Sequence, residues 1–382
     1  MTTNLFAFPD RATGFVPERL AEARLVRQMS RAELARELSV TGQAIGYYET
    51  GERRPDMSVL LRIADVLQQP VSFFLRESPS FAGVRGTRFF RSIGTRSNKV
   101  NYALDVKTKW LWEIVGFVGK NIKLPPVNLP AVPAAKDRDG YSLSEIEEIA
   151  TTVRRHWGLS DGPIANVIAL FETHGIVVTR FELGSDEIDA FSCWIRKRPY
   201  VLLGSDKKSC CRSRYDAVHE LGHLILHSHI GQEDLENKET RDLIESEANM
   251  FAGAFLLPRP AMFREFYSTR MKHLQGLKER WRVSMQAIAH RAKDIGIIDE
   301  HQYILFRKQV SFNRWQKREP LDDVIQLEQP MWLLKCWRAL IERKVVREAG
   351  LEDELGFSLD LVTRLFGHES LKYRPPGSNQ FA

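Results

Sequence analysis

Cysteines at zinc-knuckle spacing, a long apolar segment and a leader pattern are all missing from this sequence of 382 residues. Its four cysteines have neither the spacing of a zinc knuckle nor the density of a secreted disulfide scaffold, so free thiols are expected. The longest apolar run, residues 110–119, has about half the length of a membrane span and is interrupted by Glu113. The N-terminus shows no basic region followed by an apolar one. We therefore expect a cytoplasmic protein with no membrane partner.

Positive charge is concentrated in the first third of the chain. Residues 1–125 contain 19 Lys and Arg against 12 Asp and Glu, a net charge of +7, whereas the remainder contains 36 against 37. A basic N-terminal module is typical of nucleic-acid binding, although a solvated basic face produces the same composition.

The N-terminal region has the pattern of short helices joined by tight turns. Ser30 and Glu33 have the spacing of a capping box, which predicts the start of one helix. Thr41 is the expected N-cap of a second helix, and Gly51 follows its end. Two such helices have the size of a helix-turn-helix unit. A helical domain that docks a protein would give a similar pattern and stays an alternative.

In a helix-turn-helix unit the second helix lies in the major groove of double-stranded DNA, with its first residues facing base edges. The residues expected to contact DNA are Thr41, Gln43, Ala44, Tyr47, Arg53 and Arg54. The amide of Gln43 can read adenine through two hydrogen bonds, and Arg53 or Arg54 can hold phosphates.

Residues 34–55, followed by "LLRIADVL", resemble the helix-turn-helix domain of the Xre and lambda-repressor class. Two positions depart from that pattern. Ser39 stands where the family usually has a turn glycine, and Gly46 stands at a recognition-helix position that is often polar. The second departure leaves the base preference open.

Beyond residue 140 the pattern changes to helix, helix, small sheet and helix, which is an α+β order. Ser142 and Glu145 repeat the capping-box spacing, and a second helix is expected to begin near Pro163 and to end at Gly175. Segments rich in β-branched and aromatic residues predict strands in residues 176–183, 188–195 and 199–203.

The segment "HELGH", residues 219–223, has the pattern of a zinc hydrolase. On a helix His219 and His223 are neighbours on one face, so both imidazoles can reach one ion, and Glu220 is placed to take a proton from water. His227 lies about 12 Å along the helix from His219, too far to join the same ligand set. We interpret His227 as a helix-end histidine or as a hydrogen-bonding partner of a ligand.

A catalytic zinc ion needs a third protein ligand. The helix predicted from residue 245 offers Glu245 and Glu247. Glu247 shares the apolar face of Phe251 and Ala254, because it precedes them by four and seven residues. We therefore expect Glu247 to be the ligand, with Glu245 as the next candidate.

Residues 212–227 and 245–258 resemble the two signatures of ImmA/IrrE-type metallopeptidases, and residues 162–204 resemble the helix and sheet that precede them in that family. The resemblance implies that His219, His223 and Glu247 bind Zn²⁺. Val218, where alanine is common in the family, is a conservative departure. A looser resemblance extends through residues 277–292.

These patterns predict a mostly helical α+β protein. The expected ranges are a helix-turn-helix DNA-binding domain at 1–78, a basic helical connector with a proline-rich linker at 79–140, a zinc metallopeptidase core with a small sheet at 141–260, and a helical C-terminal region at 261–382. The expected partners are double-stranded DNA and a protein substrate, with a homodimer left open.

The predicted function is that of a DNA-binding transcriptional regulator with a peptidase domain, in which Glu220 is the catalytic base of amide hydrolysis. The family resemblance implies cleavage of a protein partner, typically an Xre-type repressor, in stress response or mobile-element control. Two alternatives stay open: a regulator whose zinc domain only senses or docks, and a toxin or antitoxin component. A substrate strand is expected to pair near Ala190–Trp194, and Tyr215 and His290 are open candidates for stabilising the oxyanion.

Overall fold

The computed structural model describes residues 14–79, 98–133, 135, 140–181, 183, 189–205, 209–231, 233–346, 352 and 355–365. The chain divides into two compact units. Unit 1 contains the described residues of 14–79, 98–123 and 333–365, and unit 2 contains those of 124–332. In sequence, unit 2 is therefore inserted between two parts of unit 1. No described helix is long and apolar enough to cross a membrane.

This division differs from the ranges expected from the sequence. The C-terminal range 261–382 is shared between the units, with the border before Leu333. The helical part of the expected connector belongs to unit 1, whereas its proline-rich part belongs to unit 2. The basic stretch at 85–97 lies outside the described residues.

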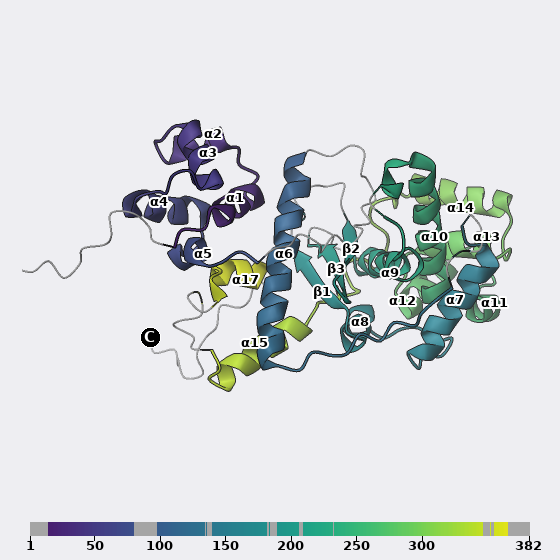
Figure 1. Ribbon diagram of the computed structural model, residues 1–382. Helices are drawn as coiled ribbons and strands as arrows, with labels where there is room; N and C mark the ends of the chain where they lie inside the picture. Colours follow the sequence, from purple (N-terminus) through teal and green to yellow (C-terminus); the bar gives the residue numbers. More distant parts are fainter. Residues whose placement is uncertain are drawn as a thin grey trace, which may run out of the picture. The chain divides into compact units, whose positions relative to one another are not determined.

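Five short helices form the N-terminal part of unit 1 (Figure 1). They are α1 (Pro17–Val26), α2 (Arg31–Glu37), α3 (Gly42–Thr50), α4 (Met57–Leu67) and α5 (Val71–Leu75). The predicted capping box forms between Ser30 and Glu33, and the Thr41 hydroxyl accepts a hydrogen bond from the Ala44 N–H at 3.1 Å. The helix-turn-helix arrangement of α2 and α3 is therefore set by local capping signals in the sequence.

A buried ion pair fixes α3 against α1. The Arg24 guanidinium contacts the Glu49 carboxylate at 2.5 Å and also donates to the Met29 carbonyl oxygen at 2.7 Å. Arg31 adds a second, more exposed pair with Glu49 at 2.6 Å. Because Glu49 lies on α3, these contacts set the orientation of that helix within unit 1.

Residues distant in the sequence complete unit 1. They form α6 (Asn98–Asn121), α15 (Trp332–Glu342), which begins at the border between the units, and α17 (Leu359–Leu365). Buried Arg19 of α1 pairs with Glu113 of α6 at 2.7 Å. The ring of Phe357, just before α17, lies 5.6 Å from that of Trp110.

Unit 2 is built on a three-stranded sheet. The strands are β1 (Val177–Phe181), β2 (Ala190–Ile195) and β3 (Arg198–Gly204), in the order β1-β3-β2. β1 is parallel to β3, with Val177 opposite Tyr200, and β2 is antiparallel to β3, with Ala190 opposite Leu203. The three predicted strands are confirmed, and β2 lies at one edge of the sheet.

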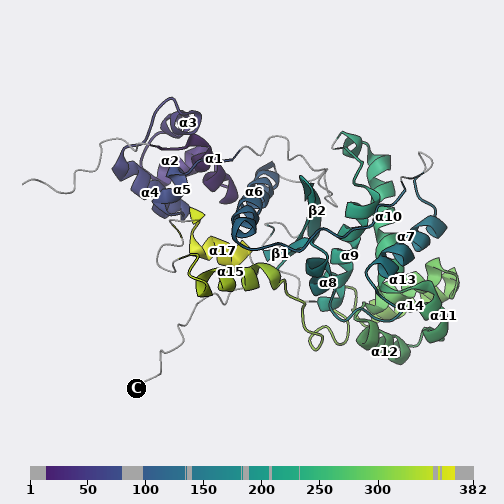
Figure 2. The same ribbon diagram turned by 60° about the horizontal axis from the view of Figure 1, so that its bottom comes forward.

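Helices supply most of unit 2 (Figure 2). They are α7 (Leu143–His156), α8 (Val167–Thr173), α9 (Cys210–Leu226), α10 (Lys238–Leu256), α11 (Arg259–Glu265), α12 (Met271–Trp281), α13 (Met285–Asp294) and α14 (Glu300–Phe312), with a 3₁₀ turn at Asp234–Glu236. α8 and α9 pack on the sheet. α9 packs on β2 and β3 with one side and on α10 with the other, so it is buried along most of its length. The predicted α+β, mostly helical fold is confirmed.

One predicted helix start is wrong. α8 was expected to begin near Pro163, but its N-cap is Asn166, whose side chain accepts from the Ala169 N–H at 2.8 Å. The buried Glu328 carboxylate also accepts from the Val167 N–H at 2.9 Å. Two acceptors at Val167–Ala169 therefore outweigh the preference of proline for the first turn.

Ser39 adopts the left-handed conformation that favours glycine, with φ of 53°. We expect Ser39→Gly to raise the free energy of unfolding by about 1 kcal/mol, because glycine has no Cβ to strain at positive φ. Thermal or denaturant unfolding of the full chain measures this change. Ser39→Ala is the matched control and should not stabilise the protein; stabilisation by both or by neither contradicts the prediction.

Candidate functional site

The two histidines of the HExxH motif lie side by side on α9. The Nε2 atoms of His219 and His223 are 3.1 Å apart, and both side chains are buried. Burial lowers the pKa of His223 to about 3, so this ring is neutral near pH 7. A neutral imidazole is the form that binds a metal ion.

The carboxylate that faces this pair comes from Glu245 on α10. Its two oxygens lie 3.3 Å from His219 Nε2 and 3.5 Å from His223 Nε2. Burial alone would raise the pKa of Glu245, but its proximity to His219 and His223 holds the pKa well below its ordinary value. The group therefore combines two imidazoles with an ionised carboxylate.

The structure does not bring Glu247 to His219 and His223, which corrects the choice of Glu247 over Glu245. The Glu247 carboxylate instead contacts His227 Nε2 at 2.7 Å and accepts from the Tyr141 N–H at 2.5 Å. Glu247 does lie on the buried face of α10, as expected. Both carboxylates meet α9, Glu245 at His219 and His223 and Glu247 at the C-cap residue His227, so the crossing of the two helices decides which carboxylate faces the histidine pair.

The separations among the three donor groups fit a metal ion. Ligand atoms at the usual zinc distances, arranged as a tetrahedron, lie ~3.3 Å from one another. The two imidazole nitrogens are 3.1 Å apart, and each lies 3.3–3.5 Å from a different Glu245 oxygen. With one ligand atom taken from each residue, all three atoms lie within 4.8 Å of one another. Neutral nitrogen and carboxylate oxygen are also the donors of catalytic zinc sites. These three residues could therefore hold one metal ion with a fourth position open.

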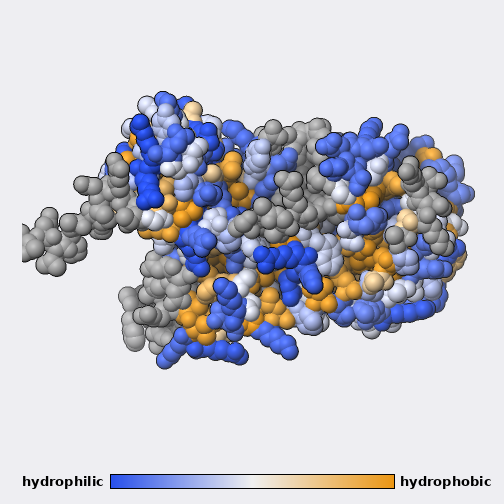
Figure 3. Space-filling model, viewed as in Figure 1, coloured by the Kyte–Doolittle hydropathy of each residue, from blue (hydrophilic) through white to orange (hydrophobic). Residues whose placement is uncertain are grey.

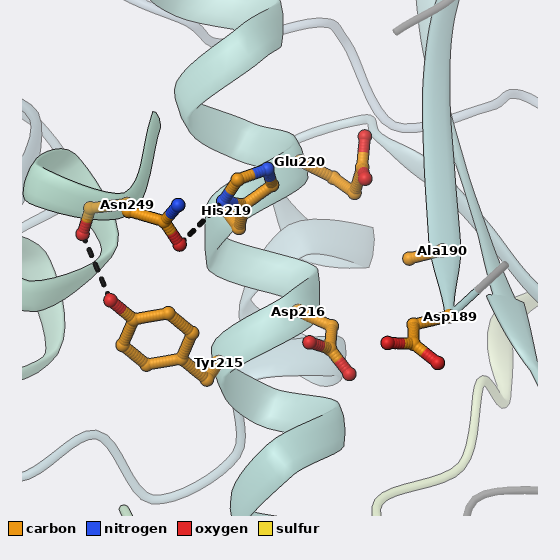
Figure 4. A pocket seen from close by; sticks show the side chains of 7 residues that line it. All are labelled: Asp189, Ala190, Tyr215, Asp216, His219, Glu220 and Asn249. Carbon is orange, nitrogen blue, oxygen red and sulfur yellow. Dashed lines mark hydrogen bonds between the residues drawn. The ribbon is translucent and has the colours of Figure 1, made fainter. Parts of the chain in front are cut away.

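Glu220 lies beside this group, next to a small pocket between α9, α10 and the start of β2 (Figure 4). The pocket is lined by Asp189, Ala190, Tyr215, Asp216, His219, Glu220 and Asn249. Buried Oε2 of Glu220 has no hydrogen-bond partner among the described residues. A buried carboxylate oxygen without a partner is costly, and it is suited to receive a proton from a molecule in the pocket.

Tyr215 and His290 have different positions relative to this pocket. Tyr215 lines it, and its hydroxyl donates to the Asn249 carbonyl oxygen at 2.9 Å. His290 is more than half exposed and pairs with Asp294 at 2.8 Å. Of the two, Tyr215 lines the pocket, whereas His290 is not among the residues that line it.

The residues expected to contact DNA, in α3 and at its two ends, are all accessible. Six side chains are exposed or half-buried: Thr41, Gln43, Ala44, Tyr47, Arg53 and Arg54. Gln43 Nε2 donates to the Tyr47 hydroxyl at 2.6 Å, and the Arg53 guanidinium lies 4.9 Å from the centre of the Tyr47 ring. Hydrophilic residues dominate the surface over α2 and α3 in Figure 3. Gly46 adds no side chain here, and a Cβ placed on it would meet open space.

Two family models match this chain. Residues 20–74 match the helix-turn-helix model, and residues 171–293 match the model of the IrrE N-terminal-like domain, Peptidase_M78. The chain therefore joins a helix-turn-helix domain to an IrrE N-terminal-like domain. The combination predicted from the sequence is confirmed.

Curated relatives are similar over part of the chain. Two proteins named "Uncharacterized HTH-type transcriptional regulator", from Sinorhizobium medicae and Rhizobium meliloti, are each 32% identical over 90 residues. These matches cover 24% of this chain and 61% of each relative, so the chain spans less than two thirds of their length.

Burial raises the pKa of Glu220 to about 8, with the nearby His219 acting in the opposite direction. Between pH 4.5, the ordinary pKa of a glutamate carboxyl group, and pH 8, the folded protein keeps the Glu220 proton whereas the unfolded chain has lost it. The free energy of unfolding of the metal-free protein therefore falls as pH rises through this range. The loss at pH 7, relative to acidic pH, is on the order of 3 kcal/mol. We expect Glu220→Gln to unfold at a higher temperature than the wild type at pH 8 and at a similar one at pH 4.5.

Thermal unfolding of chelator-treated protein across this range measures the difference. Glu239→Gln, an exposed change on α10, is the control and should follow the wild-type curve. Wild-type and Glu220→Gln curves that stay parallel from pH 4.5 to 8 would contradict the assignment.

Proposed function

We propose that this protein is a DNA-binding transcriptional regulator with a zinc-dependent peptidase domain that cleaves a protein partner. The observation that carries the proposal is the grouping of His219, His223 and Glu245 within 3.1–3.5 Å, beside the buried Glu220 carboxylate. Structural zinc sites are closed by four protein ligands, whereas the described residues supply three here, with a pocket beside them. That difference favours a catalytic role.

A zinc ion held by these three residues would supply a Lewis acid for the scissile carbonyl. Glu220 accepts a proton from the water that attacks the carbonyl carbon and passes it to the leaving amine nitrogen, so the carboxylate is restored at the end of the cycle. Its buried Oε2 has no hydrogen-bond partner among the described residues, and a zinc ion beside it would favour the ionised carboxylate that accepts the proton. Tyr215 lines the same pocket, and its hydroxyl would have to turn from the Asn249 carbonyl oxygen to donate to the substrate oxygen.

The substrate is proposed to be an extended protein segment. Within the described residues, β2 has β3 as its single strand neighbour, and Ala190 at its start lines the pocket. An added strand beside β2 would gain backbone hydrogen bonds and direct its chain past Glu220. The family resemblance favours an Xre-type repressor as the partner.

DNA binding is proposed for α3. Its N-terminal turn exposes Gln43 and Tyr47, and Arg53 and Arg54 follow in the next loop, where phosphates lie in this motif. The helix-turn-helix domain also underlies the proposal of a cytoplasmic location, where DNA is accessible. Binding of two copies to paired half-sites, as homodimers of this motif do, stays a prediction.

Incubation of the zinc-loaded chain with the protein products of neighbouring genes tests the peptidase. We expect one discrete cut in one of them, and a rate at least ~100-fold lower for Glu220→Gln, since general base catalysis contributes about that much or more. Glu220→Gln should still bind one equivalent of zinc, because Glu220 is not in the ligand group. If Glu220→Gln keeps zinc and behaves as the wild type in every assay, the result would contradict the peptidase. It would favour the alternative function, a regulator whose zinc domain only senses or docks.

DNA binding is tested with the DNA upstream of the gene for this protein. We expect the double change Gln43→Ala and Tyr47→Ala to weaken binding roughly tenfold or more in a gel-shift or fluorescence titration, because base contacts are lost. Gln309→Ala, exposed on α14, is the matched control and should bind as the wild type does. Unchanged affinity of the double variant would remove α3 as the reading helix.

A further inference from the structure

We propose that Glu247 and His227 act as a relay that fixes the ring proton of His223 on Nδ1, so that its Nε2 is unprotonated, as metal binding requires. The inference rests on the proposed metal site and adds two positioning residues that do not touch the ion. It also gives Glu247 and His227, both buried, a defined role.

The relay begins at the backbone N–H of Tyr141, which can donate a hydrogen bond but cannot accept one. The Tyr141 N–H donates to Glu247 Oε1 at 2.5 Å. The preceding Gly140 has φ of +84°, and a Cβ on it would overlap Glu247 Oε1, so glycine permits this approach. The second oxygen, Oε2, lies 2.7 Å from His227 Nε2. Since a carboxylate only accepts, His227 must carry its proton on Nε2.

The next contact transmits this choice to the metal ligand. In a neutral ring with a proton on Nε2, Nδ1 is an acceptor. His227 Nδ1 lies 3.0 Å from His223 Nδ1, so His223 must be the donor of this hydrogen bond. His223 therefore carries its proton on Nδ1, and the lone pair of its Nε2 points toward His219 and Glu245.

A separate contact produces the same result at His219. Asn249 Nδ2 donates to the Glu245 carbonyl oxygen at 2.8 Å, which fixes the amide orientation. Asn249 Oδ1 then accepts from His219 Nδ1 at 3.1 Å. Both histidines therefore present unprotonated Nε2 atoms to one point. Outer hydrogen-bond partners of this kind typically change metal affinity 10–100-fold when they are lost.

Glu247→Gln tests the relay with almost no change in shape. The Tyr141 N–H continues to need an acceptor, so the amide oxygen faces it and the amide NH₂ faces His227. His227 must then accept on Nε2 and donate from Nδ1, which forces the His223 proton onto Nε2, where it blocks metal binding. We expect zinc affinity to fall roughly 10–100-fold in a competition titration.

A direct readout does not need the metal. Two-bond ¹H–¹⁵N correlation spectra of histidine-labelled, chelator-treated protein report which ring nitrogen carries the proton. We expect His223 to be protonated on Nδ1 in the wild type and on Nε2 in Glu247→Gln. A wild-type His223 protonated on Nε2 would overturn the relay, and this measurement decides even if the variant does not fold.

Two controls separate the relay from the metal site itself. Glu245→Gln should lose zinc affinity but keep the His223 proton on Nδ1, because Glu245 is not part of the relay. Glu239→Gln should change neither property. If the wild type binds no zinc, the proposed function is wrong. The spectra of the metal-free protein still test the relay, because they report the position of the His223 ring proton. If Glu247→Gln keeps both wild-type zinc affinity and the Nδ1 proton, the relay is wrong.

Discussion

Close packing of α9 on α10 is the constraint on which the metal-binding group depends. Gly222 of α9 faces α10 so closely that a Cβ on it would lie 3.2 Å from the Ala248 Cα and 3.3 Å from the Phe251 ring. Small residues at this crossing let the two helix backbones approach. Only at this distance can Glu245 reach the histidine pair and Asn249 reach His219 Nδ1. The position of the donors is thus a consequence of helix packing.

Polar groups around this crossing are organised in two layers. The inner layer is His219, His223 and Glu245, and the outer layer is Asn249, His227 and Glu247. Each outer group is itself held by a backbone group, directly or through a neighbour, as with the Tyr141 N–H on Glu247. Buried polar groups are stable when they are connected in this way, and the connection leaves each ring little freedom to rotate.

Local patterns in the sequence were sufficient to predict the capping boxes, the three strands and the histidine pair, because each depends on neighbours within one or two helical turns. The choice between Glu245 and Glu247 was not predictable in that way. A helical face can be assigned from spacing, but the crossing of α9 and α10 decides which flank meets the histidines. One signal was present: Asn249 follows Glu245 by four residues, so two polar groups share the flank that contacts His219. The unit borders were also not predicted, because the contact of Phe357 with Trp110 of α6 joins residues far apart in the sequence.

The central claim is that His219, His223 and Glu245 hold one zinc ion. Diffraction at the zinc absorption edge from crystals of the zinc-loaded full chain tests it most directly. The account predicts one anomalous peak within about 2.2 Å of His219 Nε2, His223 Nε2 and a Glu245 carboxylate oxygen. A peak ligated by Glu247 or His227, or no peak at the histidine pair, would contradict it.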